Sequence, residues 1–185
     1  MSDSEYEQKK KKEKEFESHT PHREVRLLAL GGLMAALIFC ATYFIKLPIP
    51  WAQGYIHIGD GFVFLAAVML PTPYAVGAAA IGAGLSDLIG GYPLWIPATV
   101  GVRIIAVLML EKGSRDPLCP RIFLALAGAA AVNVVGYWGY ESAVIYGNAL
   151  SGVAAMPFNF AQSAVGAVIF VLAARPAVKM SHRYV

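Results

Sequence analysis

Charged side chains are scarce in most of this sequence. Residues 1–26 hold seven of the 15 Lys and Arg residues and seven of the 12 Asp and Glu residues, which leaves eight basic and five acidic residues for the rest of the chain. A soluble globular protein needs far more charge than this to cover its surface. The scarcity excludes a soluble enzyme, a DNA-binding domain and a secreted disulfide-stabilised domain, and it predicts a polytopic membrane protein.

Cysteine and the common catalytic motifs are also nearly absent. Cys40 and Cys119 lie far apart in sequence and show no CxxC spacing, so neither a disulfide nor a zinc site is indicated. The chain has no G-x-x-x-x-G-K-[ST] loop for ATP hydrolysis, and neither H-E-x-x-H nor G-x-S-x-G. The basic run over 9–14 is balanced by neighbouring acids and has only Phe16 for stacking on bases, so we expect no nucleic-acid partner.

Apolar runs between Pro, Gly and charged residues mark six candidate membrane spans. The first begins near Leu27 and continues for about twenty residues, enough to cross a bilayer, so we interpret it as a retained helix and not as a cleavable signal. The second and fourth are short and follow loops rich in Pro, Gly and aromatics, which is typical of helices beside a ligand cavity. We expect an all-α membrane protein with a bundle of about six transmembrane helices. The six runs cover residues 25–46, 58–70, 74–90, 96–111, 121–141 and 153–174.

The basic residues set the expected orientation, because Lys and Arg near span ends favour the cytoplasm. They gather in the N-terminal tail, in the loop between the fourth and fifth spans and in the C-terminal tail, whereas the opposite loops hold only Lys46. We therefore expect both termini in the cytoplasm. The domain organisation follows: a charged, disordered tail over 1–24, a membrane domain over 25–174 and a short cytoplasmic tail over 175–185.

Polar and aromatic side chains gather in the outer half of the predicted bundle. Arg103 lies roughly 9 Å inward from Pro97 at 1.5 Å per residue, and no other basic residue lies so deep. Acids, amides and aromatics that converge in this way favour a polar, aromatic-lined pocket open to the exterior. The candidate binding residues are Tyr55, His57, Asp60, Asp87, Tyr92, Trp95, Arg103, Asn133, Tyr137, Glu141, Asn159 and Gln162.

Each of these groups also has a structural interpretation. Tyr and Trp rings settle at headgroup depth in membrane proteins, although the inner edge of this chain offers few of them. Asp87 and Arg103 could pair between the third and fourth spans, and the amides could join helices by hydrogen bonds. His57 and Asp60, with Asp87 as a third ligand, could hold a metal ion, but a lone His in a loop is a weak signal, and we expect no metal or cofactor.

The first span is rich in small residues. Gly31 and Ala35, like Gly32 and Ala36, follow a small-x-x-x-small spacing, which puts small side chains on one helix face and permits a second helix to approach closely. These four residues form either a docking face for a partner or an internal packing surface, because the third span is equally rich in Gly and Ala.

Four stretches of the chain resemble substrate-binding S components of energy-coupling-factor (ECF) vitamin transporters, in the riboflavin-type group. The similarity extends over 25–174, and the Ile-Gly-Asp-Gly and Pro-x-Asn-x-x-Gln elements are its most distinctive parts. Arg103 stands where this group usually has Lys, and a planar guanidinium could select a different ligand group. The matching stretches are 43–50 (YFIKLPIP), 54–67 (GYIHIGDGFVFLAA), 84–93 (GLSDLIGGYP) and 156–162 (MPFNFAQ).

The resemblance implies a binding subunit, not an enzyme, in a prokaryotic plasma membrane. It would capture a water-soluble vitamin or precursor from outside, with riboflavin, hydroxymethylpyrimidine, a pyridoxine form and a ribazole all open as ligands. The first span would dock on a transmembrane coupling subunit that two ATPase subunits drive, and the first outer loop would be the gate over the substrate. The alternatives are a stand-alone permease or channel and, further off, a membrane-embedded enzyme that uses His57, Asp60 and Asp87.

Overall fold

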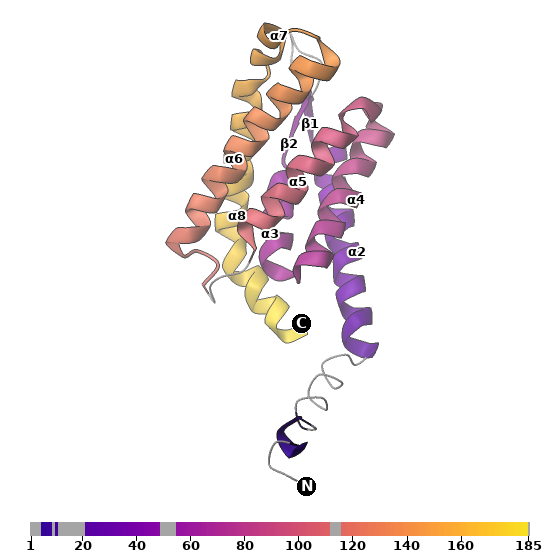
Figure 1. The fold of residues 1–185 in the computed structure, drawn as a ribbon, viewed down its shortest axis with the longest axis vertical. Coiled ribbons are helices and arrows are strands. Elements are labelled where there is room, and N and C mark those ends of the chain that lie inside the picture. Colours follow the sequence, from indigo (N-terminus) through magenta and orange to yellow (C-terminus); the bar gives the residue numbers. More distant parts are fainter. Residues whose placement is uncertain (1–4, 9, 11–20, 49–54, 112–115, 185) are drawn as a thin grey trace.

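The computed structural model describes residues 5–8, 10, 21–48, 55–111 and 116–184, which are mainly helical (Figure 1). Each of the six predicted apolar runs forms a helix, with most ends within a few residues of the prediction. The helices are α2 (Pro21–Tyr43), α3 (Gly59–Met69), α4 (Thr72–Gly90), α5 (Ile96–Leu110), α6 (Pro120–Tyr140) and α8 (Met156–Tyr184).

Local sequence explains where several of these helices begin and end. Proline stands in the first turn of α4, α5 and α6, where its missing N–H would have no helical partner. Gly91 ends α4 with a φ of 85°, a left-handed conformation that glycine adopts without steric cost. After α6 comes a π-helical stretch, Glu141–Ile145, and then the short α7 (Ala149–Val153), whose first turn is capped by the Asn148 side chain.

Both chain ends differ from the sequence prediction. α2 begins at Pro21, inside the tail predicted over 1–24, most of which lies outside the described residues. α8 continues to Tyr184, through most of the tail predicted over 175–185. The prediction ended the helix where the apolar run stops. Lys and Arg sustain a helix well, so a change in polarity at Arg175 does not end it.

A short antiparallel hairpin joins α2 to α3, and the all-α prediction does not include it. β1 (Lys46–Pro48) pairs with β2 (Tyr55–His57), and Lys46 lies opposite His57. The residues between the strands, 49–54, lie outside the described residues. Figure 1 shows the hairpin near the end of the bundle that also carries α7, away from the end where α2 begins and α8 stops.

The central helix α3 is buried along most of its length and packs mainly against α8. Two glycines allow this close approach. A Cβ added at Gly166 would lie 2.7 Å from the Cβ of Asp60, and one added at Gly61 would lie 2.7 Å from Ile169. Only hydrogen fits at these positions. The packing holds Asp60, in the first turn of α3, against α8 in the middle of the bundle.

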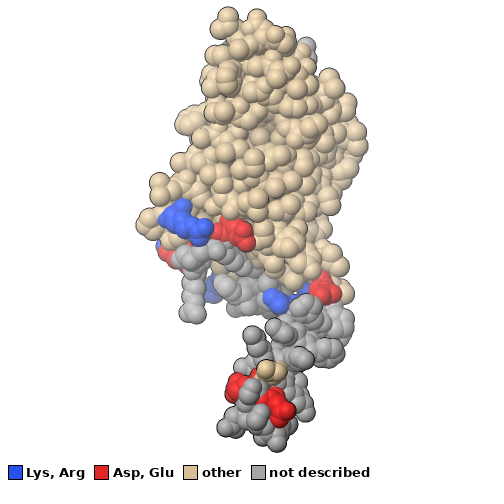
Figure 2. Space-filling view, viewed as in Figure 1, with Lys and Arg blue, Asp and Glu red and all other residues tan. Residues whose placement is uncertain are grey.

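The outside of the bundle is apolar. Leu and Ile side chains such as Leu28, Leu124 and Leu172 are 63–76% exposed, which is unfavourable in water and favourable in lipid. Figure 2 shows the described charged residues on this face near the end where α2 begins and α8 stops, below an uncharged surface. Within the described residues, four segments are long and apolar enough to cross a bilayer: Arg23–Tyr43, Pro93–Leu110, Pro120–Ile145 and Ala149–Met180. The chain is therefore a mainly helical membrane protein.

Candidate functional site

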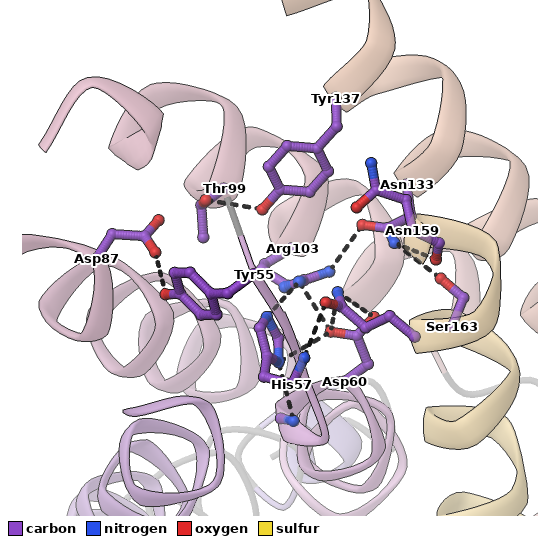
Figure 3. Close-up of polar contacts among 12 residues, drawn as sticks. Tyr55, His57, Asp60, Asp87, Thr99, Arg103, Asn133, Tyr137, Asn159 and Ser163 are labelled. Atoms are coloured by element: carbon purple, nitrogen blue, oxygen red, sulfur yellow. Dashed lines mark hydrogen bonds and ion pairs between the residues drawn. The ribbon is translucent and has the colours of Figure 1, made fainter. Parts of the chain in front are cut away.

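A buried ion pair lies at the centre of the bundle. Asp60 at the start of α3 and Arg103 on α5 are 1% and 2% exposed, and Arg103 Nη2 lies 2.8 Å from Asp60 Oδ1 (Figure 3). Gln162 on α8 donates from Nε2 to both oxygens of Asp60, at 3.2 and 3.4 Å. An isolated charge at this depth would be very costly, so these contacts are what make both charges tolerable.

Asn133 extends this network to one more helix, α6. It accepts a hydrogen bond from Arg103 Nη1 at 3.2 Å. Its amide group then donates to the backbone carbonyl of Asn159 at 3.1 Å and to the hydroxyl of Ser163 at 2.9 Å (Figure 3). Asn133 thus joins α5, α6 and α8 by hydrogen bonds, as the structural interpretation of the amides expects.

The hairpin is tied to the same network through His57. The backbone N–H of His57 donates to Gln162 Oε1 at 3.2 Å, and its Nδ1 accepts the N–H of Gly59 at 3.0 Å. Because Nδ1 is an acceptor, the neutral ring carries its proton on Nε2. Nε2 lies 3.4 Å from Arg103 Nη2, so two hydrogen-bond donors face each other there. Burial lowers the pKa of His57 to about 4, with Asp60 opposing the shift and Arg103 adding to it. The imidazole is therefore neutral at pH 7.

A small cavity lies beside this network. The space open to the centre of a water molecule is about 30 Å³, enough for one or two waters. The residues around it come from the hairpin, from α4, α5, α6 and α8 and from the π-helical stretch after α6, with Tyr92 and Trp95 from the turn before α5. They are Tyr55, His57, Asp87, Tyr92, Trp95, Thr99, Tyr137, Glu141, Asn159 and Gln162.

Aromatic rings form much of the cavity wall. The ring centroids of Tyr55 and Tyr92 lie 4.9 Å apart, and those of Tyr92 and Trp95 lie 5.7 Å apart. The Tyr137 hydroxyl lies 2.7 Å from that of Thr99, so its ring is fixed against α5. Rings held in this way offer flat apolar faces for stacking on a planar molecule.

Two carboxylates complete the wall. Tyr55 donates from its hydroxyl to Asp87 Oδ1 at 2.6 Å, and Trp95 donates from its indole N–H to Glu141 Oε1 at 3.1 Å. Each acid thus holds an aromatic ring with one of its oxygens. The cavity combines planar apolar surfaces with fixed hydrogen-bond acceptors, an arrangement suited to binding a small polar heterocycle.

The structure brings most of the predicted site residues together, but in two layers. Every lining residue except Thr99 belongs to the predicted set, whereas the predicted Asp60, Arg103 and Asn133 form the network beside the cavity instead of its wall. The alternative in which Arg103 pairs with Asp87 is wrong, because the partner of Arg103 is Asp60. Among the described residues no three His, Cys, Asp or Glu side chains are grouped to hold a metal ion.

Sequence reasoning missed Thr99 and Ser163. Thr99 stands one helical turn before Arg103, and Ser163 one turn after Asn159, so each shares a helix face with a polar residue that was identified. An i, i+4 search from the identified residues would have found both.

The small residues of the first span line a long apolar groove between α2 and α4, of about 810 Å³. Gly32 and Ala36 are exposed in it, and a Cβ added at Gly32 would meet nothing within 4 Å. Gly31 is buried, and the carbonyl of Ala35 would lie 2.5 Å from a Cβ added at Gly82. Part of the small-residue face thus packs inside the protein, and part of it lies open.

Three comparisons with known proteins found similar sequences or structures, and one of them identifies a family. A family model described as "ECF-type riboflavin transporter, S component" matches residues 23–178. A Pyrococcus woesei protein, described as an uncharacterized protein in the gap 3′ region, is 32% identical over 131 residues, which covers 69% of this chain and 84% of that protein. A solved structure titled as the S component of a bacterial ECF transporter has the same fold, with a TM-score of 0.67 at 19% identity, covering 85% of this chain and 96% of that one.

Proposed function

Because this chain belongs to the family of S components of ECF-type riboflavin transporters, which are substrate-binding subunits and not enzymes, we propose that it captures a vitamin or vitamin precursor. The ligand would be bound outside the cell, for ATP-driven uptake by partner subunits. The observation that carries the proposal is the cavity itself. Four aromatic rings and two carboxylates surround it, next to an ion pair that already has its own partners.

The proposed orientation has six helices across the membrane and both termini in the cytoplasm. It is supported by the charged residues near the end where α2 begins and α8 stops (Figure 2). The hairpin and α7 lie at the opposite end, so the cavity would face the exterior (Figure 1). α3, with 11 residues, is too short to cross a bilayer by itself, but its buried position shields its ends from lipid.

The proposed docking face is the groove between α2 and α4. Gly32 and Ala36 leave its floor open, and the flanking Leu28, Ile81 and Leu85 are exposed apolar side chains. A helix of a transmembrane coupling subunit could lie in this groove at close range. The chain has no ATP-binding loop, so two ATPase subunits bound to the coupling subunit would supply the energy.

Reconstitution tests this proposal. The purified protein should carry a heterocyclic vitamin or precursor that mass spectrometry identifies after denaturation. Vesicles with this protein alone should bind that molecule without accumulating it, and vesicles that also hold the coupling and ATPase subunits should concentrate it when ATP is supplied. Equilibration of the molecule by this protein alone would instead identify a permease, and the absence of any bound small molecule would reject the binding role.

A further inference from the structure

The two carboxylates of the cavity each leave one oxygen without a partner. Asp87 and Glu141 are both 4% exposed, and within the described residues Asp87 Oδ2 and Glu141 Oε2 accept no hydrogen bond. An unsatisfied buried polar atom destabilises the protein, and more so when it is charged. Both residues line the cavity, so N–H groups of a molecule bound there can satisfy these oxygens.

The positive charges nearest to the cavity belong to Arg103 and Lys46, and both are partly engaged by other groups. Arg103 is held by Asp60 at 2.8 Å and by Asn133 at 3.2 Å, while its Nε has no hydrogen-bond partner among the described residues. The Lys46 ammonium lies over the rings of Tyr43, Tyr55 and Tyr92, at 4.4, 4.5 and 5.8 Å from their centroids. No Lys or Arg is among the residues that the structure places around the cavity. An acidic ligand would therefore meet two carboxylates in the cavity wall, with no Lys or Arg among the lining residues.

The aromatic wall suits the same chemistry. A cation gains electrostatic energy over the face of a Trp or Tyr ring, and a flat heterocycle gains stacking energy on it. Tyr55 and Trp95 are each fixed by a hydrogen bond to one of the two carboxylates, so aromatic face and unpartnered oxygen belong to the same rigid pair.

We propose that the ligand is a flat nitrogen heterocycle that carries an amino group at its edge and no acidic group, with Asp87 Oδ2 and Glu141 Oε2 as the acceptors of its N–H bonds. This inference rests on the proposed binding function and narrows its substrate class. Molecules of the same ring type that carry a carboxylate or phosphate are rejected, because they would place a negative charge beside the two acids of the cavity wall.

Ligands that share a ring and differ in one substituent provide the test. Pyridoxamine, pyridoxine and 4-pyridoxate place an aminomethyl group, a hydroxymethyl group or a carboxylate on the same pyridine ring, and 4-amino-5-hydroxymethyl-2-methylpyrimidine has a 4-hydroxy counterpart. Binding to the purified protein is measured by calorimetry and by Trp fluorescence. In each ring series that binds, the amino compound should bind tenfold or more tightly than its neutral counterpart, and 4-pyridoxate should not bind. Equal or tighter binding of the neutral or acidic member in a series that binds would overturn the inference.

The carboxylate variants connect any preference to these two residues. Asp87→Asn and Glu141→Gln should each weaken binding of the amino compound at least tenfold and leave the affinity for its neutral counterpart within a factor of three, which also shows that the variant is folded. Asp116→Asn, at an exposed acid of the loop before α6, is the matched control. Loss of both affinities to the same extent in folded variants would contradict the assignment.

The inference and the proposed function fail in different ways. If none of these compounds binds, the molecule that co-purifies decides: an amino-bearing heterocycle supports the inference, and a heterocycle without an amino group overturns it while the binding function stands. If nothing binds and nothing co-purifies, the proposed function itself is wrong.

Discussion

Replacing Arg103 with Met tests the energetics of the buried ion pair. Met has a similar length and no charge, so the change removes the 2.8 Å contact with Asp60 and leaves that carboxylate with only the two bonds from Gln162. Breaking a buried pair by removing one partner costs about 3–5 kcal/mol of the free energy of unfolding. Asp60→Asn should cost about as much, because it leaves the Arg103 guanidinium buried without a counter-ion.

The double variant, with Asp60→Asn and Arg103→Met together, should be more stable than either single variant. It buries no charge, and its remaining loss is that of individual hydrogen bonds at about 0.5–1.5 kcal/mol each. We expect a coupling energy of at least about 3–5 kcal/mol from the double-mutant cycle, because a double variant that is more stable than either single one has lost less than one single change costs. The measurement is unfolding in detergent, followed by Trp fluorescence. Additive losses would show that the two residues are not energetically coupled, and the reasoning would fail.

Ligand binding distinguishes the network from the cavity wall. Neither Asp60 nor Arg103 lines the cavity, so the folded double variant should bind the ligand within about threefold of the original affinity, a change of less than 1 kcal/mol. A tenfold loss without unfolding would assign the ion pair to the binding surface.

Three further perturbations have defined outcomes. His57 has a pKa of about 4 in the folded protein and about 6.5 in the unfolded chain, so between these pH values the unfolded chain binds more protons. The free energy of unfolding should therefore fall by up to about 3 kcal/mol as the pH drops from 6.5 to 4. In pH-dependent unfolding measurements, His57→Gln should lack this component. A methyl group added at Gly166 would lie 2.7 Å from the Cβ of Asp60 on α3, so Gly166→Ala should lower the free energy of unfolding by about 1–3 kcal/mol. Gly139→Ala is the control and should be neutral or stabilising, because nothing lies within 4 Å of a Cβ added there. Equal effects of the two changes would refute the tight α3–α8 contact. Ala36→Trp should abolish uptake by the complete transporter and leave the ligand affinity of the isolated protein unchanged, because the bulky ring fills the groove. Leu124→Trp, at an exposed position on α6, is the control. Normal uptake by the Ala36 variant would exclude the groove as the docking face.

The sequence predicts the helices well because each one must bury or expose a continuous apolar run, and Pro and Gly end those runs. It does not predict the hairpin at Lys46–Pro48 and Tyr55–His57, since two three-residue strands in a Pro-rich loop leave no alternating pattern long enough to detect. The continuation of α8 beyond Arg175 was missed because polarity was taken as a boundary, whereas helical backbone does not require an apolar side chain.

The candidate site shows a similar division. The residue types that meet at the outer end could be identified, because polar groups inside a membrane protein are few and need a reason. Their pairing could not, because it depends on how the helices are placed in space. From the sequence, either Asp60 or Asp87 could be the partner of Arg103. In the structure the close packing of α3 on α8 at Gly166 holds Asp60 in the middle of the bundle, where it pairs with Arg103.

The narrow cavity bears on kinetics. A space of about 30 Å³ holds water but no heterocycle, so the cavity wall, which includes the hairpin, must open before a ligand can enter. The His57 N–H bond to Gln162 and the Tyr55 hydroxyl bond to Asp87 both resist that movement. Association then waits for opening, which makes it slower than binding to an open site. The same closure delays escape. A protein built in this way gains affinity through a long residence time, which suits the retention of a scarce molecule after a rare encounter.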